Sequence, residues 1–414
     1  MTDTLKPDSA EQVREVVAWA AAEGAALEIA GSGSKRGIGR PRGRGNEAPA
    51  HVLSLAGLSG ITLYEPEELV LSARAGTPLA EIAAALAGAG QMLAFEPPDL
   101  PRLWDAGAAA GQGTAGGLVG CGIAGPRRVK AGAVRDHLLG AHGVSGRGEA
   151  FKTGGRVVKN VTGYDLSKLV TGAWGTLAAL TEVTFKVLPA PEATVTLLLA
   201  AEDAARGVAV LTAGLGSSHD VSGAAYLPAP VARRSRVAAV AGAGRGLAAL
   251  RLEGFAASVA ARVAALTTAL APRGEVVALD DGASRALWDE IRDAAYFAGG
   301  AAPLWRVSVA PQAGAGVADA VTRAAGGEAL LDWGGGLVWL ALPDAPDAHA
   351  TTVRGAVAAA GGGHATLLRA ADAVRAAVPV FEPQPAGLAA LSRRVKAQFD
   401  PQGILNPGRM AEGV

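Results

Sequence analysis

A stretch dense in glycine, alanine and threonine, from Gly113 to Pro189, constrains this chain more than any other feature. It opens with GTAGGLVGCGIAGPRRVKAGAVRDH and ends with KNVTGYDLSKLVTGAWGTLAALTEVTFKVLP, so small residues alternate with apolar segments. Glycine lets a backbone approach a ligand or another segment closely, because it carries no side chain. The stretch therefore indicates close approach to something large and flat, for which a dinucleotide cofactor is the natural candidate.

The composition indicates a globular chain with no general attraction for nucleic acid. Its 414 residues, 50% of them apolar, suffice for two or three domains. The 38 basic and 38 acidic residues cancel, so we expect no nucleic-acid partner. A local positive excess occurs in KRGIGRPRGR, residues 35–44, which is either a solvated loop or a segment that faces a phosphate or a partner.

We expect a cytoplasmic protein, or one that is peripheral to the inner membrane through its partners. No apolar run reaches the roughly 18 to 20 residues that a transmembrane helix needs, and MTDTLKPDSAEQ does not have the pattern of a signal peptide. Cys121 is the only cysteine, so this chain alone cannot hold an iron–sulfur cluster, which commonly takes four thiolates. A small packing role for Cys121 is favoured over a nucleophilic one. The six histidines are scattered, so no metal site is expected.

The start of the chain is typical of a strand that leads into an anion-binding turn. Ser9 and Gln12 predict a capping box for a helix that ends at Gly24. A short strand over residues 27–30 is followed at once by GSGSKRGIG, beginning at Gly31. Successive backbone N–H groups in such a turn can converge on an anion.

Two glycine patterns resemble nucleotide-binding fingerprints only in part. Residues 31–33, GSG, lack the third glycine of a Rossmann fingerprint, and residues 111–116, GQGTAG, follow WDAG rather than a buried strand. The P-loop pattern G-x-x-x-x-G-K-[ST] does not occur. The sequence thus favours neither a Rossmann NAD site nor a P-loop NTPase.

The remaining segments predict an α+β protein. Residues 51–99 alternate short β-rich runs with one helix over residues 78–87 and end in a rigid turn at Pro97, Pro98 and Asp99. After Pro189, strand and helix patterns alternate, which is typical of helices on one face of an antiparallel sheet in a ferredoxin-like arrangement. The end of the chain, LSRRVKAQFDPQGILNPGRM, predicts a helix with a basic face that stops at a Pro-Gly turn.

Four ordered motifs carry a family resemblance: GTAGG at residues 113–117, RDH at 135–137, KNVTGYDL at 159–166 and GTL at 175–177. In this order they resemble the FAD domain of the vanillyl-alcohol-oxidase/PCMH flavoprotein superfamily. Within it, CGIAGPRR and VRDHLLG are most similar to the FAD-binding subunits of bacterial glycolate oxidases. The resemblance spans about half of the chain, with a second short match at the C-terminus.

The resemblance implies a PCMH-type FAD-binding domain over residues 1–189, an α+β cap over 190–380 and a C-terminal segment, 381–414, that returns to the flavin. It also implies the residues that bind FAD. The pyrophosphate would face N–H groups of Ala30, Gly31, Ser32, Gly33 and Ser34, with Lys35 as a nearby charge. The ribityl chain or ring would lie against a second glycine loop formed by Thr114, Ala115, Gly116, Gly117, Gly120, Cys121 and Gly125. The adenine-ribose half would lie at Gly175, Thr176, Leu177 and Thr181, and the remaining contacts would come from Pro98, Asn406 and Arg409.

We expect noncovalent FAD, because the loop GSGSKRGIGRPRG holds neither histidine nor cysteine for attachment. A branched residue at Gly116 is expected to fill space that the cofactor needs, whereas Cys121→Ser is not expected to matter. Tyr164 and Asp165 are predicted to start a helix and to play a structural role.

Substrate chemistry leaves a weaker signal. Oxidation of a 2-hydroxy acid needs an arginine for the carboxylate and a base for the hydroxyl proton, and His219, His349 and His364 stand alone in loop-like surroundings. Catalytic residues therefore stay unassigned. The resemblance favours an FAD-binding subunit that passes electrons from a small 2-hydroxy acid together with a catalytic flavoprotein subunit and an iron–sulfur subunit. A standalone FAD-dependent dehydrogenase and a non-catalytic nucleotide-binding scaffold remain alternatives.

Overall fold

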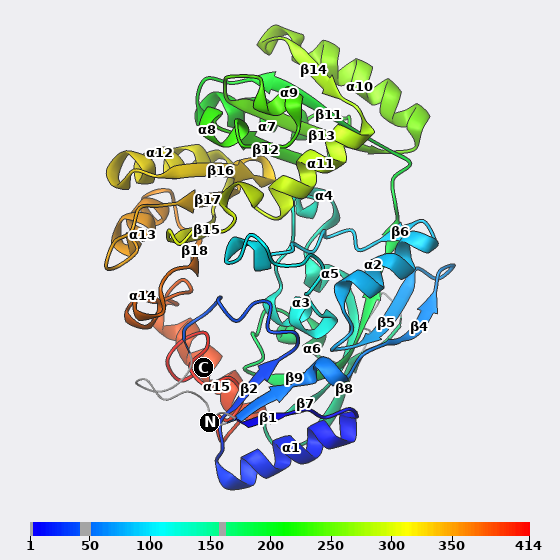
Figure 1. The fold of residues 1–414 in the computed structure, drawn as a ribbon, viewed down its shortest axis with the longest axis vertical. Helices are drawn as coiled ribbons and strands as arrows, with labels where there is room; N and C mark the ends of the chain where they lie inside the picture. Colours follow the sequence, from blue (N-terminus) through cyan, green and yellow to red (C-terminus); the bar gives the residue numbers. More distant parts are fainter. Residues whose placement is uncertain (1–2, 42–50, 157–162) are drawn as a thin grey trace.

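The structure is a computed structural model that describes residues 3–41, 51–156 and 163–414. Figure 1 shows two bodies stacked along the long axis: an N-terminal body (residues 3–189) below and a cap (residues 193–369) above. The C-terminal segment descends from the cap and ends beside the first strands of the chain (Figure 1).

The N-terminal body contains two principal sheets. A three-stranded parallel sheet has the order β1-β3-β2, and a five-stranded antiparallel sheet has the order β4-β5-β9-β7-β8. The strands are β1 Asp3–Leu5, β2 Leu27–Ala30, β3 His51–Ser54, β4 Ile61–Glu65, β5 Val70–Arg74, β6 Gln91–Met92, β7 Leu138–Ser145, β8 Ala150–Gly154, β9 Ala178–Lys186 and β10 Leu188–Pro189. The helices are α1 Ala10–Glu23, α2 Leu79–Gly88, α3 Ala115–Cys121, α4 Arg128–Ala131, α5 Val134–His137 and α6 Leu166–Val170, with short 3-10 turns η1 Leu55–Gly57 and η2 Pro101–Leu103.

Helix α1 begins and ends where the sequence predicts. Ser9 accepts a hydrogen bond from the backbone N–H of Gln12 at 3.2 Å, and Gly24 closes the helix in the left-handed conformation with φ 65°. The side chain of Gln12 accepts from the backbone N–H of Asp8 at 3.0 Å instead of from that of Ser9. The cap is therefore reciprocal, but it reaches one residue farther back than a standard capping box.

The cap is one eight-stranded antiparallel sheet of order β14-β11-β13-β12-β16-β17-β15-β18. Its strands are β11 Ala193–Ala200, β12 Gly223–Leu227, β13 Leu247–Gly254, β14 Val276–Leu279, β15 Leu304–Ser308, β16 Glu328–Asp332, β17 Leu337–Ala341 and β18 His364–Arg369. The longer helices are α7 Ala204–Leu215, α10 Ala256–Leu270, α11 Asp281–Arg292, α12 Gly314–Ala325 and α13 Ala350–Ala359. The shorter ones are α8 Ala229–Ala232, α9 Ala238–Ala241, η3 Ala271–Arg273, η4 Ala295–Phe297, η5 Pro311–Ala313 and η6 Trp333–Gly335.

The strand order agrees with the predicted ferredoxin-like arrangement and adds that the cap contains two such units in tandem. Each half follows the chain order strand-helix-strand-strand-helix-strand and places its fourth strand beside its first. The halves join edge to edge through β12 and β16, where Tyr226 lies opposite Leu331. The sequence reading missed β16 and β18. Pairing two edges removes a row of unpaired backbone groups that a single unit would expose.

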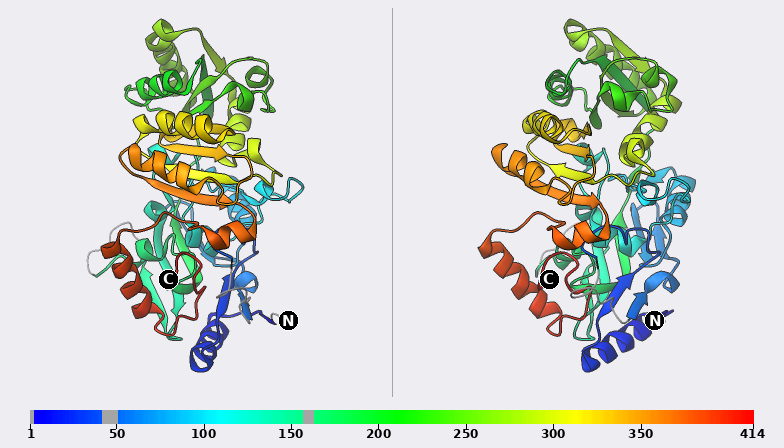
Figure 2. Two further views of the ribbon diagram at one scale, coloured as in Figure 1. Left: turned by 90° about the vertical axis from the view of Figure 1, so that its left-hand side faces the viewer. Right: turned by 60° about the vertical axis from the view of Figure 1, so that its left-hand side comes forward.

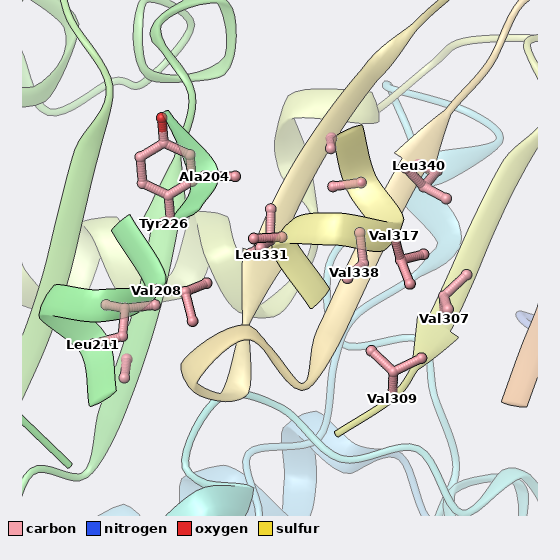
Figure 3. Close-up of a cluster of buried hydrophobic side chains, with 14 of the residues drawn as sticks. Ala204, Val208, Leu211, Tyr226, Val307, Val309, Val317, Leu331, Val338 and Leu340 are labelled. Carbon is pink, nitrogen blue, oxygen red and sulfur yellow. The ribbon is translucent and has the colours of Figure 1, made fainter. Parts of the chain in front are cut away.

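The two faces of the cap sheet bury different partners. On one face, side chains from both ferredoxin-like halves form a single core under α7, α10, α12 and α13, and Figure 3 shows ten labelled members of it, including Leu211, Tyr226 and Val338. The other face carries Trp339, Leu337 and Leu304 and packs against residues of the N-terminal body such as Leu103. The cap and the N-terminal body therefore share a hydrophobic core.

The C-terminal segment joins the first sheet of the chain. It contains α14 Asp372–Ala377 and α15 Ala386–Phe399, and both views of Figure 2 show α15 beside the N-terminal body. Beyond α15, the backbone N–H of Leu27 donates to the carbonyl of Ile404 at 2.8 Å. Lys396 is the one buried residue of α15. It donates to Asp400 at 2.6 Å and to the backbone carbonyls of Thr176 and Leu405.

Helices and sheets are combined as the α+β prediction requires. Among the described residues, no helix combines the length and the hydropathy that crossing a membrane requires. We propose unit boundaries near residues 189 and 380, since β10 ends at Pro189, β11 begins at Ala193 and α14 precedes the descent to α15.

Candidate functional site

A cavity opens where the end of β2, helix α3, the loop after α6 and the C-terminal segment meet. It holds about 920 Å³ of space, part of it continuous with solvent. Fourteen of the twenty residues predicted to bind the cofactor line it: Ala30, Gly31, Ser32, Gly33, Ser34, Lys35, Thr114, Gly116, Gly117, Gly120, Cys121, Gly175, Asn406 and Arg409.

The glycine-serine turn after β2 lies directly against the second glycine motif. A Cβ atom on Gly31 would lie 2.3 Å from Oγ1 of Thr114, so only glycine fits at this contact. Gly33 adopts a φ of +79°, which glycine tolerates best. The two motifs, although 80 residues apart in sequence, thus form neighbouring walls of one cavity.

The second glycine motif is a helix, which corrects the expectation of a loop. Thr114 is the N-cap of α3, and its side chain accepts from the backbone N–H of Gly117 at 3.3 Å. A Cβ on Gly116 would lie 2.8 Å from the Cβ of Ala75, whereas a Cβ on Gly120 would meet no atom within 4 Å. Gly116 therefore allows the helix to pack against the strand region at Ala75, and Gly120 leaves open space in the cavity. For that reason we expect a larger residue to fill cofactor space at Gly120, and not at Gly116 as the sequence predicted.

The loop after α6 supplies the third wall. Trp174 and Gly175 both have positive φ, 52° and 70°, and the backbone N–H of Trp174 donates to the carbonyl of Gly120 at 2.8 Å. A Cβ on Gly175 would lie 2.6 Å from Nδ2 of Asn406. This loop is therefore shaped by contacts to both α3 and the C-terminal segment.

Asn406 and Arg409 attach the C-terminal segment to the cavity. Asn406 accepts from the backbone N–H of Ile29 at 2.8 Å and donates to the carbonyl of Trp174 at 2.7 Å. Arg409 donates to the carbonyl of Lys35 at 3.2 Å. The Asn406 side chain thus connects β2 to the loop after α6, and the C-terminal segment closes the cavity.

One end of the cavity is cationic. Lys35, Arg36 and Arg409 line it, and Arg36 also pairs with Glu28, with Nε and Oε1 2.8 Å apart. Burial lowers the pKa of Arg409 to about 10, and nearby arginines add to that shift, yet the group stays charged at neutral pH. Burial raises the pKa of the Cys121 thiol, which keeps it protonated. A cationic end joined to apolar walls suits a ligand with one anionic and one aromatic part.

Six predicted residues lie away from this cavity. Ala115 is fully buried in the core, and Gly125 accepts at its carbonyl from Nε1 of Trp333 in the cap at 3.0 Å. Thr176 and Leu177 face a second cavity beside α15, whose lining they share with Leu388 and Leu391. Pro98 and Thr181 complete the six; both are buried.

Sequence reasoning missed ten lining residues: Glu28, Ile29, Arg36, Leu55, Ala75, Val170, Ala173, Trp174, Ala178 and Leu180. Most are apolar members of strands or helices, whose pattern does not distinguish a cavity wall from a core. Trp174 carried a usable signal, because it directly precedes the GTL motif.

The other predicted motifs lie outside the cavity. Asp136 accepts from the backbone N–H of Ala133 at 2.7 Å, so the RDH motif stabilises the turn at α5. Asp165 caps α6, accepting from the N–H of Lys168 at 3.3 Å, but Tyr164 is 92% exposed and has no packing role. Residues 159–162 of KNVTGYDL and 42–44 of the basic segment lie outside the described residues.

The described cavity lining contains no histidine or tyrosine that could act as a base. His349 contacts the carbonyl of Pro343 at 3.1 Å, His364 is exposed at the start of β18, and His219 lies in a turn. Across the described ranges, no three histidine, cysteine, aspartate or glutamate side chains gather as metal ligands would. The catalytic residues therefore stay unassigned.

Comparisons with known proteins agree with this geometry. Residues 4–154 match the family described as "FAD binding domain". The chain is 35% identical over 406 residues to "Glycolate oxidase subunit GlcE" of Escherichia coli, with 97% of each chain covered. It is 41% identical over 85 residues to "Glycolate oxidase subunit GlcD" of Bacillus subtilis, covering 20% of this chain and 18% of that one. In fold it is similar to p-cresol methylhydroxylase, at a TM-score of 0.72 and 16% identity over 99% of this chain and 88% of that one.

Proposed function

The chain belongs to the family of FAD-binding oxidoreductase subunits that includes GlcE, and from this membership we propose that it is the FAD-binding subunit of a glycolate oxidase complex. The complex would oxidise glycolate to glyoxylate. The observation that carries the proposal is the cavity in which two glycine motifs, a positive-φ loop and the C-terminal segment enclose apolar walls and a cationic end.

The residues of the cavity suit FAD in their chemistry. Lys35 and Arg409 would lie beside the pyrophosphate and balance its charge. The open space beside Gly120 would admit the flat ring system, and Trp174 would close that side against water. With no histidine in the described lining and the Cys121 thiol kept protonated by burial, we propose that FAD is held noncovalently.

When bound, FAD supplies the redox chemistry, since the oxidation of glycolate to glyoxylate releases two electrons and two protons. The chain holds a single cysteine and its described lining has no histidine or tyrosine to act as a base, so its residues would bind and orient the cofactor and exclude water. We propose that a catalytic flavoprotein subunit and an iron–sulfur subunit complete the complex. Electrons would then leave this chain through its partners.

Turnover measurements test this assignment. The purified chain is expected to show little glycolate-dependent dye reduction, and activity is expected when the flavoprotein and cysteine-rich subunits are co-expressed with it. A variant of this chain that has lost FAD should lower the activity of the assembled complex. Rapid glycolate or lactate turnover by the isolated chain would replace the proposal with a standalone dehydrogenase, and a chain that assembles without ever binding flavin would replace it with a scaffold.

A further inference from the structure

The seam between the N-terminal body and the cap is rich in arginine, and two of its arginines are fully neutralised. Arg127 lies 2.8 Å from Glu253 and 3.3 Å from Glu96. Arg251 donates to both carboxylate oxygens of Glu96, at 2.8 and 2.9 Å. These pairs join the two bodies and leave little charge unbalanced.

Arg128 and Arg306 differ from these neighbours. Within the part of the chain that the structure describes, neither guanidinium forms an ion pair with a carboxylate. Both lie on the indole ring of Trp333, with their Cζ atoms 4.6 and 4.9 Å from its centroid. Arg128 is exposed at the surface, whereas Trp333 is 7% exposed. A ligand from solvent can thus reach Arg128 where it lies against Trp333.

Deeper in the seam, two buried donors have no acceptor. Arg306 on β15 lies directly opposite Trp339 on β17, and the Cζ of Arg306 is 5.8 Å from that indole ring. Nε of Arg306 and Nε1 of Trp339 are both buried without a hydrogen-bond partner. Neither side chain can accept a hydrogen bond, so they cannot satisfy each other. A buried donor left unpaired destabilises the protein, and an acceptor at this position would remove that cost.

The carboxyl group beside Arg306 does not fill this role. Asp332 accepts from the backbone N–H of Trp333 at 2.7 Å, and burial raises its pKa to about 7. It is therefore only partly ionised at neutral pH. Burial, followed by the charge of Arg128, lowers the pKa of Arg306 to about 10, so the guanidinium remains charged. The seam consequently holds an excess of positive charge.

We propose that Arg128, Trp333, Arg306 and Trp339 form a binding site for the carboxylate group of a small organic acid. Two guanidinium groups and an unpaired indole N–H can only donate hydrogen bonds, so they need a ligand that accepts them. A carboxylate is planar and, when ionised, only accepts hydrogen bonds. The choice of a 2-hydroxy or 2-oxo acid rests on the proposed function. The same hydrophobic cluster that contains Trp333 and Trp339 also contacts Cys121 and Trp174, two wall residues of the cofactor cavity. The site and the cavity therefore share one hydrophobic cluster.

Calorimetry on the flavin-loaded chain tests the site without needing turnover. Glycolate is the probe, and glycolamide, its neutral counterpart, is the matched ligand control. Glycolate is expected to bind at least about tenfold more tightly, because only the anion forms charge-assisted hydrogen bonds. Arg128→Ala and Arg306→Gln are each expected to weaken glycolate binding about tenfold or more. Arg323→Ala, at an exposed arginine of α12, should change nothing.

Each outcome decides the proposal. Equal binding of glycolate and glycolamide, or unchanged glycolate binding in both seam variants, overturns it. Arg306 is mostly buried, so its variant is checked by thermal unfolding; if it does not fold, the exposed Arg128→Ala variant decides alone. Flavin content and the activity of the assembled complex are measured separately. Absence of flavin and of activity in the wild-type complex would contradict the proposed function. Normal flavin content without glycolate binding would contradict only the proposed carboxylate site.

Discussion

Gly120→Val is expected to weaken FAD binding strongly while leaving the fold intact. A Cβ at this position meets no atom within 4 Å, so the side chain would project into the cavity instead of into the protein. Glycine and valine differ little in helix propensity, and we expect the free energy of unfolding without flavin to change by less than about 0.5 kcal/mol. Overpacking costs about 1–3 kcal/mol, which corresponds to a loss of FAD affinity of about 5- to 150-fold.

Gly116→Val provides the contrast on the same helix. Its Cβ would lie 2.8 Å from the Cβ of Ala75 and 3.1 Å from the Ala75 carbonyl, so the backbone must shift. We expect this variant to lose about 1–3 kcal/mol of unfolding free energy even without FAD. Gly355→Val is the control, because Gly355 is an exposed helical glycine of α13 with no atom within 4 Å.

The assay combines two measurements on each variant: thermal unfolding of the flavin-free chain and titration with FAD, followed by flavin fluorescence. We expect a stable Gly120→Val chain whose FAD affinity is about 5- to 150-fold lower, and a Gly355→Val chain that behaves as wild type in both measurements. Wild-type FAD affinity in the Gly120→Val chain would instead show that the cofactor does not lie against Gly120.

Three further perturbations test the electrostatics. Lys396→Met leaves Asp400 buried without its cation, so the free energy of unfolding should fall by about 3 kcal/mol in urea denaturation. Burial opposes ionisation of Glu253, but nearby arginines led by Arg251 outweigh burial and lower its pKa to about 2. The ionised carboxylate therefore stabilises the fold fully above pH 4.5. Unfolding measured at different pH values should show this contribution being lost as the pH falls toward 2. Burial raises the pKa of Asp332 to about 7, so wild type should lose stability relative to Asp332→Asn as the pH rises from about 4 to 8.

Each of these predictions has its own control or contrary result. Arg394→Met, at an exposed position of α15, should leave the unfolding free energy unchanged, and an equal loss in both variants would contradict the role of Lys396. Glu253→Gln should flatten the acid-side loss of stability. For Asp332, parallel stability curves for wild type and variant between pH 4 and 8 would show that the carboxyl does not titrate in this range.

The sequence predicted the part of the fold whose motifs are contiguous. The strand at residues 27–30 and the turn that follows it could be read from short runs, and the family resemblance implied the positions of Asn406 and Arg409 in the cavity wall. Helix α3 could not be read in this way, because Gly116 and Gly117 in its first turn disfavour a helix by propensity, and it is packing against Ala75 and capping by Thr114 that hold it. Tertiary contact overrode the local preference.

The cap was harder to predict for a different reason. Strands β16 and β18 directly follow helices α12 and α13 and were not predicted, so the second ferredoxin-like unit was not separated from the first. The unpaired donors of Arg306 and Trp339 come together only through the register of β15 and β17, 33 residues apart in sequence. No local pattern marks such a cross-strand pair, and the seam site is visible only in the structure.

Measuring the flavin content of the purified chain decides whether it binds FAD noncovalently. The protein is precipitated with acid, and the released material is identified and quantified against the protein concentration. We expect a yellow chain that releases about one FAD per polypeptide into the supernatant, because the cavity suits FAD and no covalent attachment is expected. A colourless chain that takes up no FAD on reconstitution would contradict it.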